Sequence, residues 1–211
     1  DMDAKDNRRS KANMASMNPD LFWSTVNYGF HYQYMHNTLQ LNRRIEGNKP
    51  FFSNISRLSG ISSTDWSWGP LFADLDNDGW KDLFISNGIR REINHRDFFN
   101  EIKLRPMAND SLLYYTKQMP SEAISNFTFK NNSDLTFSDV SQSWGLDQKN
   151  FSNGATYADL DNDGDLELIV NNVDQVAQIY KNNSNNNYVK VKLKGTDNNP
   201  IGIDSRVFVK T

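Results

Sequence analysis

Residues 74–82 read DLDNDGWKD, and residues 159–167, 85 positions further on, read DLDNDGDLE. Each segment places acidic residues at positions 1, 3, 5 and 9 around a glycine at position 6. Ca²⁺ takes six to eight oxygen ligands at flexible angles, and such a turn supplies them. Nine of the chain's 26 acidic residues lie in these two windows. Because carboxylates about 4 Å apart repel by ~1 kcal/mol even in bulk water, we expect a cation in each loop.

The expected ligands are the acidic side chains together with the backbone carbonyl of position 7. A plain surface turn would also favour Asp, Asn and Gly, but the block occurs twice at matching places. An EF-hand or dockerin loop needs a glutamate at position 12 before a helix, whereas Ile85 and Val170 stand there. The ligand set is Asp74, Asp76, Asp78, Trp80 and Asp82 in the first loop, and Asp159, Asp161, Asp163, Asp165 and Glu167 in the second.

The two loops belong to a longer internal repeat. Residues 52–82 and 137–167 align without a gap, with 13 of 31 positions identical. Residues 38–42 match 128–132 upstream, and 83–87 match 168–172 downstream. The alternation of apolar and polar residues predicts short strands. These are 38–41, 51–55, 69–74 and 81–86 in the first copy, and 126–130, 137–140, 154–159 and 167–171 in the second, with a fifth at 177–181.

These features predict an all-β fold. The chain has 28 asparagines and 11 glycines, residues that favour turns between short strands. Four-stranded antiparallel units in tandem are typical of a β-propeller; a solenoid is the competing architecture, but its units are usually shorter. Two units cannot close a propeller, so we expect the native protein to continue on both sides.

Several segments stand outside the repeat. Residues 89–125 are expected to form a partly helical insertion between adjacent blades, with helices at 94–104 and 110–118. A further short helix is predicted at 18–26, with Pro19 in its first turn. The asparagine-rich residues 182–187 are interpreted as an exposed loop. The alternating residues 188–194 and 205–210 predict a hairpin that begins a separate module.

The residues also resemble a known family. The block ending in ADLDNDG, followed by a leucine-containing strand, is similar to the FG-GAP (VCBS-type) repeats of integrin-like β-propellers. A closer resemblance is to bacterial surface proteins related to cartilage acidic protein, which join such a propeller to a C-terminal ASPIC/UnbV domain. The matching stretches are HYQYMHNTLQLN at 31–42, TDWSWGPLFADLDNDGWKDLFISNG at 64–88, WGLDQKNFSNGATYADLDNDGDLELIVNN at 144–172 and YVKVKLKGTDNN at 188–199.

This resemblance implies calcium at both loops, with a mainly structural role. Glu167 stands where the family more often has Asp, and its longer side chain should still reach the ion. The implied organisation is an N-terminal segment with the end of a preceding blade (1–37), a first blade (38–88), the helical insertion (89–125), a second blade (126–187) and the start of an ASPIC/UnbV-like module (188–211).

Composition excludes several classes of function. The net charge of −3 argues against a dedicated nucleic-acid binder, and the absence of cysteine excludes disulfides and thiolate zinc sites. The sequence shows no signal peptide and no transmembrane segment. We therefore expect a mature or internal fragment, and the resemblance to surface proteins implies a location outside the cell or attached to the outer-membrane surface.

Two classes of function remain open. The first is a surface binding or interaction module for a glycan or protein ligand, and the second is the scaffold of a calcium-dependent polysaccharide lyase or hydrolase. No acid–base constellation singles out catalytic residues, and no organic cofactor is expected. His31, His36 and His95 are interpreted as packing or solvated residues, and the pairs Arg8–Arg9 and Arg90–Arg91 as solvated. Trp66, Trp68, Phe72 and Trp80, which bracket the first loop, are either core residues or a sugar-stacking platform.

Overall fold

Short strands dominate the part of the chain that is described. The computed structural model describes residues 2–13, 19–32, 34–46, 49–105, 112–184 and 186–209. Strands lie at all nine places predicted from the repeat, and two further short strands, β5 and β8, were not expected. The strands are β1 (Gln40–Glu46), β2 (Lys49–Asn54), β3 (Ser67–Ala73), β4 (Asp82–Asn87), β5 (Ile124–Ser125), β6 (Phe127–Asn131), β7 (Phe137–Asp139), β8 (Lys149–Asn150), β9 (Ser152–Ala158), β10 (Glu167–Asn172) and β11 (Gln178–Tyr180).

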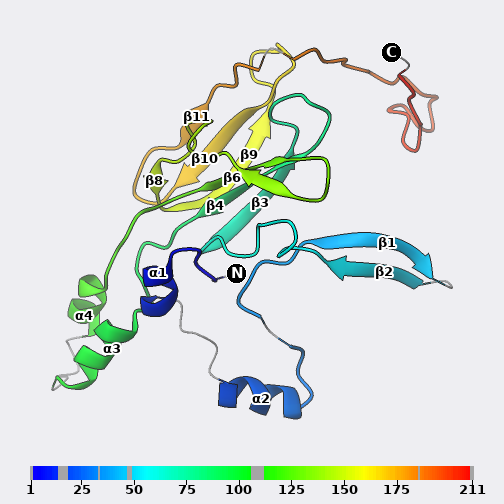
Figure 1. The fold of residues 1–211 in the computed structure, drawn as a ribbon. Coiled ribbons are helices and arrows are strands. Elements are labelled where there is room, and N and C mark those ends of the chain that lie inside the picture. The colour runs from blue at the N-terminus through cyan, green and yellow to red at the C-terminus, as the bar shows by residue number, and fades with distance from the viewer. Residues whose placement is uncertain are drawn as a thin grey trace.

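The strands form a four-stranded and a three-stranded antiparallel sheet, together with two two-stranded pairs. The larger sheet has the order β3-β4-β6-β7, and the smaller has the order β11-β10-β9. The pairs are β1-β2 and β5-β8. The two larger sheets lie side by side, with β9 next to β3 and β4 (Figure 1). All-β is thus confirmed as the main architecture, and no closed ring of sheets is present in these residues.

The sequence repeat is also a structural repeat. Strands β9 and β10 begin and end 85 residues after β3 and β4. Their pairing keeps the same register: Ala73 lies opposite Asp82 as Ala158 lies opposite Glu167. Both hairpins carry a register shift at the same place near their open end. The glycine-containing turns at 55–61 and 140–146 make the same three backbone hydrogen bonds. The aligned residues therefore dictate one local fold twice.

The grouping of strands into sheets differs from the prediction. The first two strands of the second copy, β6 and β7, join the sheet of β3 and β4 from the first copy. Strands β1 and β2 pair only with each other among the described strands, and their hairpin projects away from the sheets (Figure 1). The physical reason is that β4 offers a free edge to β6, with Phe84 opposite Thr128. A sheet thus crosses the boundary of the sequence repeat.

The core divides around β4, all of whose residues are buried. Leu83 and Ile85 pack with Ile61 and Phe129 on one face. On the other face, Phe84 packs with a cluster from the second copy that contains Leu146, Leu168 and Val170. This alternation follows from the two-residue period of a strand. Burial of apolar surface on both faces fixes the acidic turn at the end of this strand.

The insertion is partly helical, as expected, but it connects β4 to β6, which are neighbours in one sheet. It therefore does not separate two sheets. Both predicted helices are present, at Arg96–Lys103 within 94–104 and at Leu112–Gln118 within 110–118, and residues 110 and 111 lie outside the described part. The helix predicted at 18–26 is also present, although residue 18 is not described. The helices are α1 (Asn7–Ala12), which was not predicted, α2 (Pro19–Asn27), α3 (Arg96–Lys103) and α4 (Leu112–Gln118).

The hairpin predicted near the C-terminus is absent from the described residues 188–209, which contain no strand. Its valines are largely exposed: Val189 is 70%, Val191 50% and Val209 62% exposed. A two-stranded ribbon needs a covering layer for stability, and the C-terminal part of this segment extends away from both sheets (Figure 1). Alternation alone therefore misled the prediction.

Candidate metal centre

Each acidic segment forms the turn between two paired strands. The first joins β3 to β4 and the second joins β9 to β10. Gly79 and Gly164 adopt φ values of 91° and 93°, a region that glycine enters without steric cost. Asn77 and Asn162 also have positive φ, at 55° and 64°. The sharp turn expected at position 6 is therefore present in both copies, and it turns successive carboxylates inward.

The structure brings most of the predicted ligands together. In the first loop, one carboxylate oxygen from each of Asp74, Asp76 and Asp78 lies within 4.8 Å of the others. The second loop gathers four carboxylates by the same measure, from Asp161, Asp163, Asp165 and Glu167. Only oxygen donors are present in both clusters, which suits a hard cation. These acidic clusters could hold a metal ion.

Asp82 and Asp159, two other predicted ligands, stand apart from these clusters. The oxygens of Asp82 accept hydrogen bonds from the backbone N–H groups of Leu75 and Asn131, both at 3.0 Å. Burial raises the pKa of Asp82 to about 6, although these hydrogen bonds oppose the shift. Asp159 accepts a hydrogen bond from Lys190 Nζ at 2.9 Å. Asp82 thus stabilises the turn by linking its backbone, at Leu75, to that of β6, at Asn131.

Glu167 combines both roles. Its oxygens accept from the backbone N–H groups of Leu160 at 2.7 Å and Asn182 at 3.4 Å, as Asp82 does in the first copy, yet it also belongs to the second cluster. Its longer side chain explains the difference, because the extra methylene lets the carboxylate reach both the turn backbone and the cluster.

The two loops differ in the residue at position 7. Trp80 occupies it in the first loop and is 52% exposed, whereas Asp165 in the second is 3% exposed. We expected only a backbone carbonyl here, but the side chain of Asp165 joins the cluster. Its Oδ1 is buried without a hydrogen-bond partner. Burial and the neighbouring Asp163 raise the pKa of Asp165 to about 6. A buried, unpaired carboxylate oxygen is costly, and a bound cation would remove that cost.

A lysine in or directly after the neighbouring strand contacts each loop, and the sequence analysis missed both lysines. Lys130 Nζ donates hydrogen bonds to Asp76 and, at 2.8 Å, to Asp78. Lys181 Nζ donates to Asp161 at 2.8 Å. These lysines hold equivalent places, since Phe129 on β6 and Tyr180 on β11 pair with equivalent residues of β4 and β10. The matching sequences FKNN at 129–132 and YKNN at 180–183 carried the signal.

The remaining candidates have structural roles. Trp66 is buried at 7% exposure, while Trp68 donates from Nε1 to the carbonyl of Gly88 at 2.6 Å. Phe72 and Trp80 are partly exposed. His95 caps α3 by accepting from the N–H of Phe98, and His36 packs against Tyr34. The aromatic group is thus part core and part surface.

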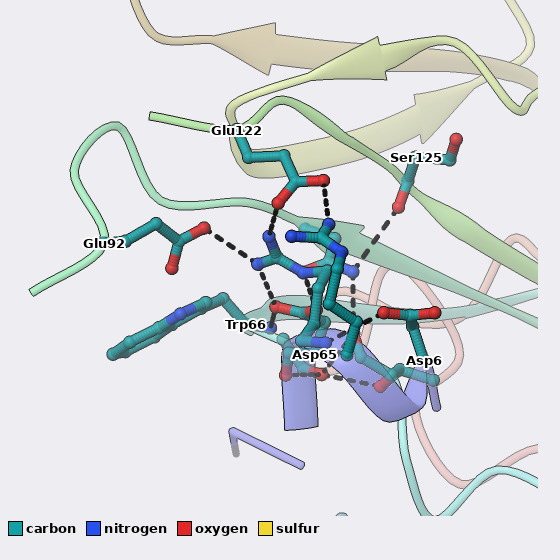
Figure 2. A network of polar contacts seen from close by, with 11 residues as sticks. Asp6, Asp65, Trp66, Glu92, Glu122 and Ser125 are labelled. Carbon is teal, nitrogen blue, oxygen red and sulfur yellow. Dashed lines mark hydrogen bonds and ion pairs between the residues drawn. The ribbon is translucent and has the colours of Figure 1, made fainter. Parts of the chain in front are cut away.

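A third group of carboxylates, separate from the two loops, surrounds Arg9, which was expected to be solvated but is 5% exposed. Its guanidinium bonds Asp65 through two nitrogens, at 2.6 and 3.0 Å, and Glu92 at 2.9 Å. Glu122, the third acidic partner, accepts a hydrogen bond from Nη1 at 2.7 Å. Figure 2 shows Glu92 and Glu122 directed toward this common centre. Arg9 therefore joins the N-terminal segment to both ends of the insertion.

The comparisons with known proteins add no family. No protein-family model matches the chain, and a search of curated proteins finds no match either. Within the described residues, none of the helices has the length and apolar character needed to span a membrane.

Proposed function

We propose that this chain is part of a calcium-stabilised, integrin-like β-propeller of the FG-GAP (VCBS-type) class. Its role would be that of a binding module, secreted or on the outer surface of a cell. The observation that carries the calcium assignment is the second loop, where four carboxylates converge and a buried oxygen of Asp165 has no partner. Calcium fits better than magnesium because it tolerates many oxygens at relaxed geometry.

The way in which the two sheets pack supports a propeller. The face of the second sheet that carries Leu168 and Val170 packs on Phe84 of the first. The residue equivalent to Phe84 is Ile169, which must lie on the opposite face of β10 because side chains alternate. Its neighbour Ile179 is 65% exposed. The contact thus joins two non-equivalent faces, one from each sheet, and is head-to-tail. Repeated contacts of this kind close into a ring when the rotation between successive sheets fits.

The strand grouping supports the same proposal. Strands β6 and β7 of the second copy complete the sheet of the first. By equivalence, the separate β1-β2 hairpin would complete the sheet of a preceding unit. The β9-β10-β11 sheet would likewise accept a fourth strand from a following one. This arrangement would interlock the units of a ring.

A hollow beside the first loop offers a place where a ligand could bind. It has a volume of about 660 Å³, and its lining includes Trp144, Tyr180, Asn183 and Asp76. Aromatic rings beside amide and carboxylate groups can bind a sugar through stacking and hydrogen bonds. We therefore favour a glycan ligand, with a protein ligand as the alternative outcome.

Two experiments test the proposal. Equilibrium dialysis of chelator-treated protein against Ca²⁺, followed by elemental analysis, should give two ions per chain, and none would contradict it. A glycan array probed with the full-length protein, with and without Trp144→Ala, tests the hollow. Binding that is lost in this variant supports a glycan ligand. Binding only in a pull-down of surface proteins would assign the module to a protein partner.

A further inference from the structure

Residues 182–187 are expected to form an exposed loop, but three of them, Asn182, Ser184 and Asn186, contact the acidic loops. Residue 185 lies outside the described part. Asn182 Nδ2 donates to the carbonyl of Leu75 at 2.6 Å and to that of Leu166 at 3.2 Å. Since Leu75 belongs to the first acidic turn and Leu166 to the second, one side chain holds both backbones.

Ser184 makes a second connection between the loops. Its backbone N–H donates to Asp165 Oδ2 at 3.1 Å, and its Oγ donates to the backbone carbonyl of Asp76 at 3.0 Å. Asn186 Nδ2 donates to the same carbonyl at 2.6 Å. The loops also touch directly, through Asn77 Nδ2 and the carbonyl of Gly164 at 3.4 Å.

These contacts end on the residues that would hold cations. Asp165 offers Oδ2 to Ser184, while its buried Oδ1 is unpaired. Asp76 accepts the bridge on its peptide oxygen and contributes its carboxylate to the first cluster. A cation that fixes Asp165 therefore also fixes Ser184 and, through it, the peptide of Asp76.

We propose that Asn182, Ser184 and Asn186 couple the two loops, so that a cation in one raises the affinity of the other. The inference rests on the proposed cation binding. Its physical basis is shared ordering: the first ion fixes the bridge, and the second then binds to a loop that is already fixed. Coupling of this kind is reciprocal and typically changes affinity about 5- to 150-fold.

The first loop can be observed separately, because Trp80 lies in it while Asp165 holds the equivalent place in the second. Tb³⁺ serves as the probe, since its luminescence is sensitised by a nearby indole. Signal that survives in Trp80→Phe is subtracted as background from other aromatic residues. The second loop is disabled by the isosteric pair Asp161→Asn and Asp163→Asn, and circular dichroism checks each fold.

Disabling the second loop should weaken Tb³⁺ binding at the first by at least about fivefold. In an Asn182→Ala/Ser184→Ala/Asn186→Ala background, which removes the three bridging side chains, the same change should alter affinity less than about twofold. Asn187→Ala, in an exposed neighbour, is the matched control and should retain the full coupling. Unchanged affinity of the first loop after loss of the second would overturn the coupling and leave the cation sites standing. Absence of Tb³⁺ and Ca²⁺ binding at both loops would overturn the proposed function as well.

Discussion

The Arg9 cluster and the acidic loops neutralise their carboxylates in different ways. Around Arg9, the counter-charge is a guanidinium whose side chain is 6% exposed, and its partners Asp65 and Glu92 are 7% and 1% exposed. In the loops, the counter-charge comes from lysines: Lys181 is 64% exposed, and Lys130 is 35% exposed. A buried guanidinium cannot leave without unfolding, whereas an exposed ammonium can move into water at little cost. The Arg9 cluster is thus a permanent ion-pair network. In the loops, a free cation can replace the lysines as partner of the carboxylates.

The largest effect should follow from Arg9→Met. The change leaves Asp65 and Glu92 buried without their cation, which typically costs about 3–5 kcal/mol. Denaturant unfolding at pH 7 measures it. Arg8→Met is the matched control, because Arg8 is 64% exposed and pairs with Glu122 at the surface; its loss should cost less than about 1 kcal/mol. Equal losses in the two variants would remove the distinction between the clusters.

Loss of single loop carboxylates should give the next largest effect. Asp76→Ala and Asp161→Ala should each reduce the stabilisation by Ca²⁺, and the double variant should nearly abolish it. At a hundredfold excess over Kd, one occupied site contributes about 2.7 kcal/mol. Thermal unfolding with and without Ca²⁺ measures the difference. A double variant with the full calcium response would show that the ion binds elsewhere.

The Arg9 cluster should also impose a pH dependence. Burial raises the pKa of Glu92 above its ordinary value of 4.5, with Arg9 opposing the shift and Asp65 and Glu122 adding to it. A raised carboxyl pKa means that the folded state binds the proton more tightly. The contribution of protonated Glu92 to the free energy of unfolding is full below pH 4.5. It is lost as the pH rises through the folded-state pKa of Glu92. Wild-type protein should therefore lose more stability between pH 4.5 and 8 than Glu92→Gln. Parallel stability curves for the two proteins would contradict this.

The smallest effect should come from Lys130→Met. Hydrogen bonds to Asp76 and Asp78 raise the pKa of Lys130, so its ammonium competes for the carboxylates that a cation needs. Removing it should tighten Ca²⁺ binding at the first loop severalfold and lower the stability of the metal-free protein by less than about 1 kcal/mol. Calorimetric titration measures the affinity. Lys103→Met, on α3 away from the loops (Figure 1), is the control, and weaker binding in Lys130→Met would contradict the competition.

Local features of this chain could be predicted from the sequence, and distant contacts could not. The ADLDNDG blocks fixed the hairpins and their 85-residue offset, because turn chemistry and alternation act over a few residues. The pairing of β4 with β6 depends on which strand reaches a free edge across the insertion. Arg9 meets Glu92 and Glu122 from 83 and 113 residues away, and no local pattern encodes such a meeting.

The central claim is that the two acidic turns are cation sites, and calorimetric unfolding of metal-free protein tests it most directly. The carboxylates of each turn repel until a cation joins them, so Ca²⁺ at a hundredfold excess over Kd should raise the unfolding free energy by about 2.7 kcal/mol for each occupied site. The midpoint temperature should rise accordingly, more with Ca²⁺ than with Mg²⁺, and a chelator should reverse it. An unchanged midpoint across metal-free, Ca²⁺ and Mg²⁺ samples would show that these loops are ordinary acidic turns.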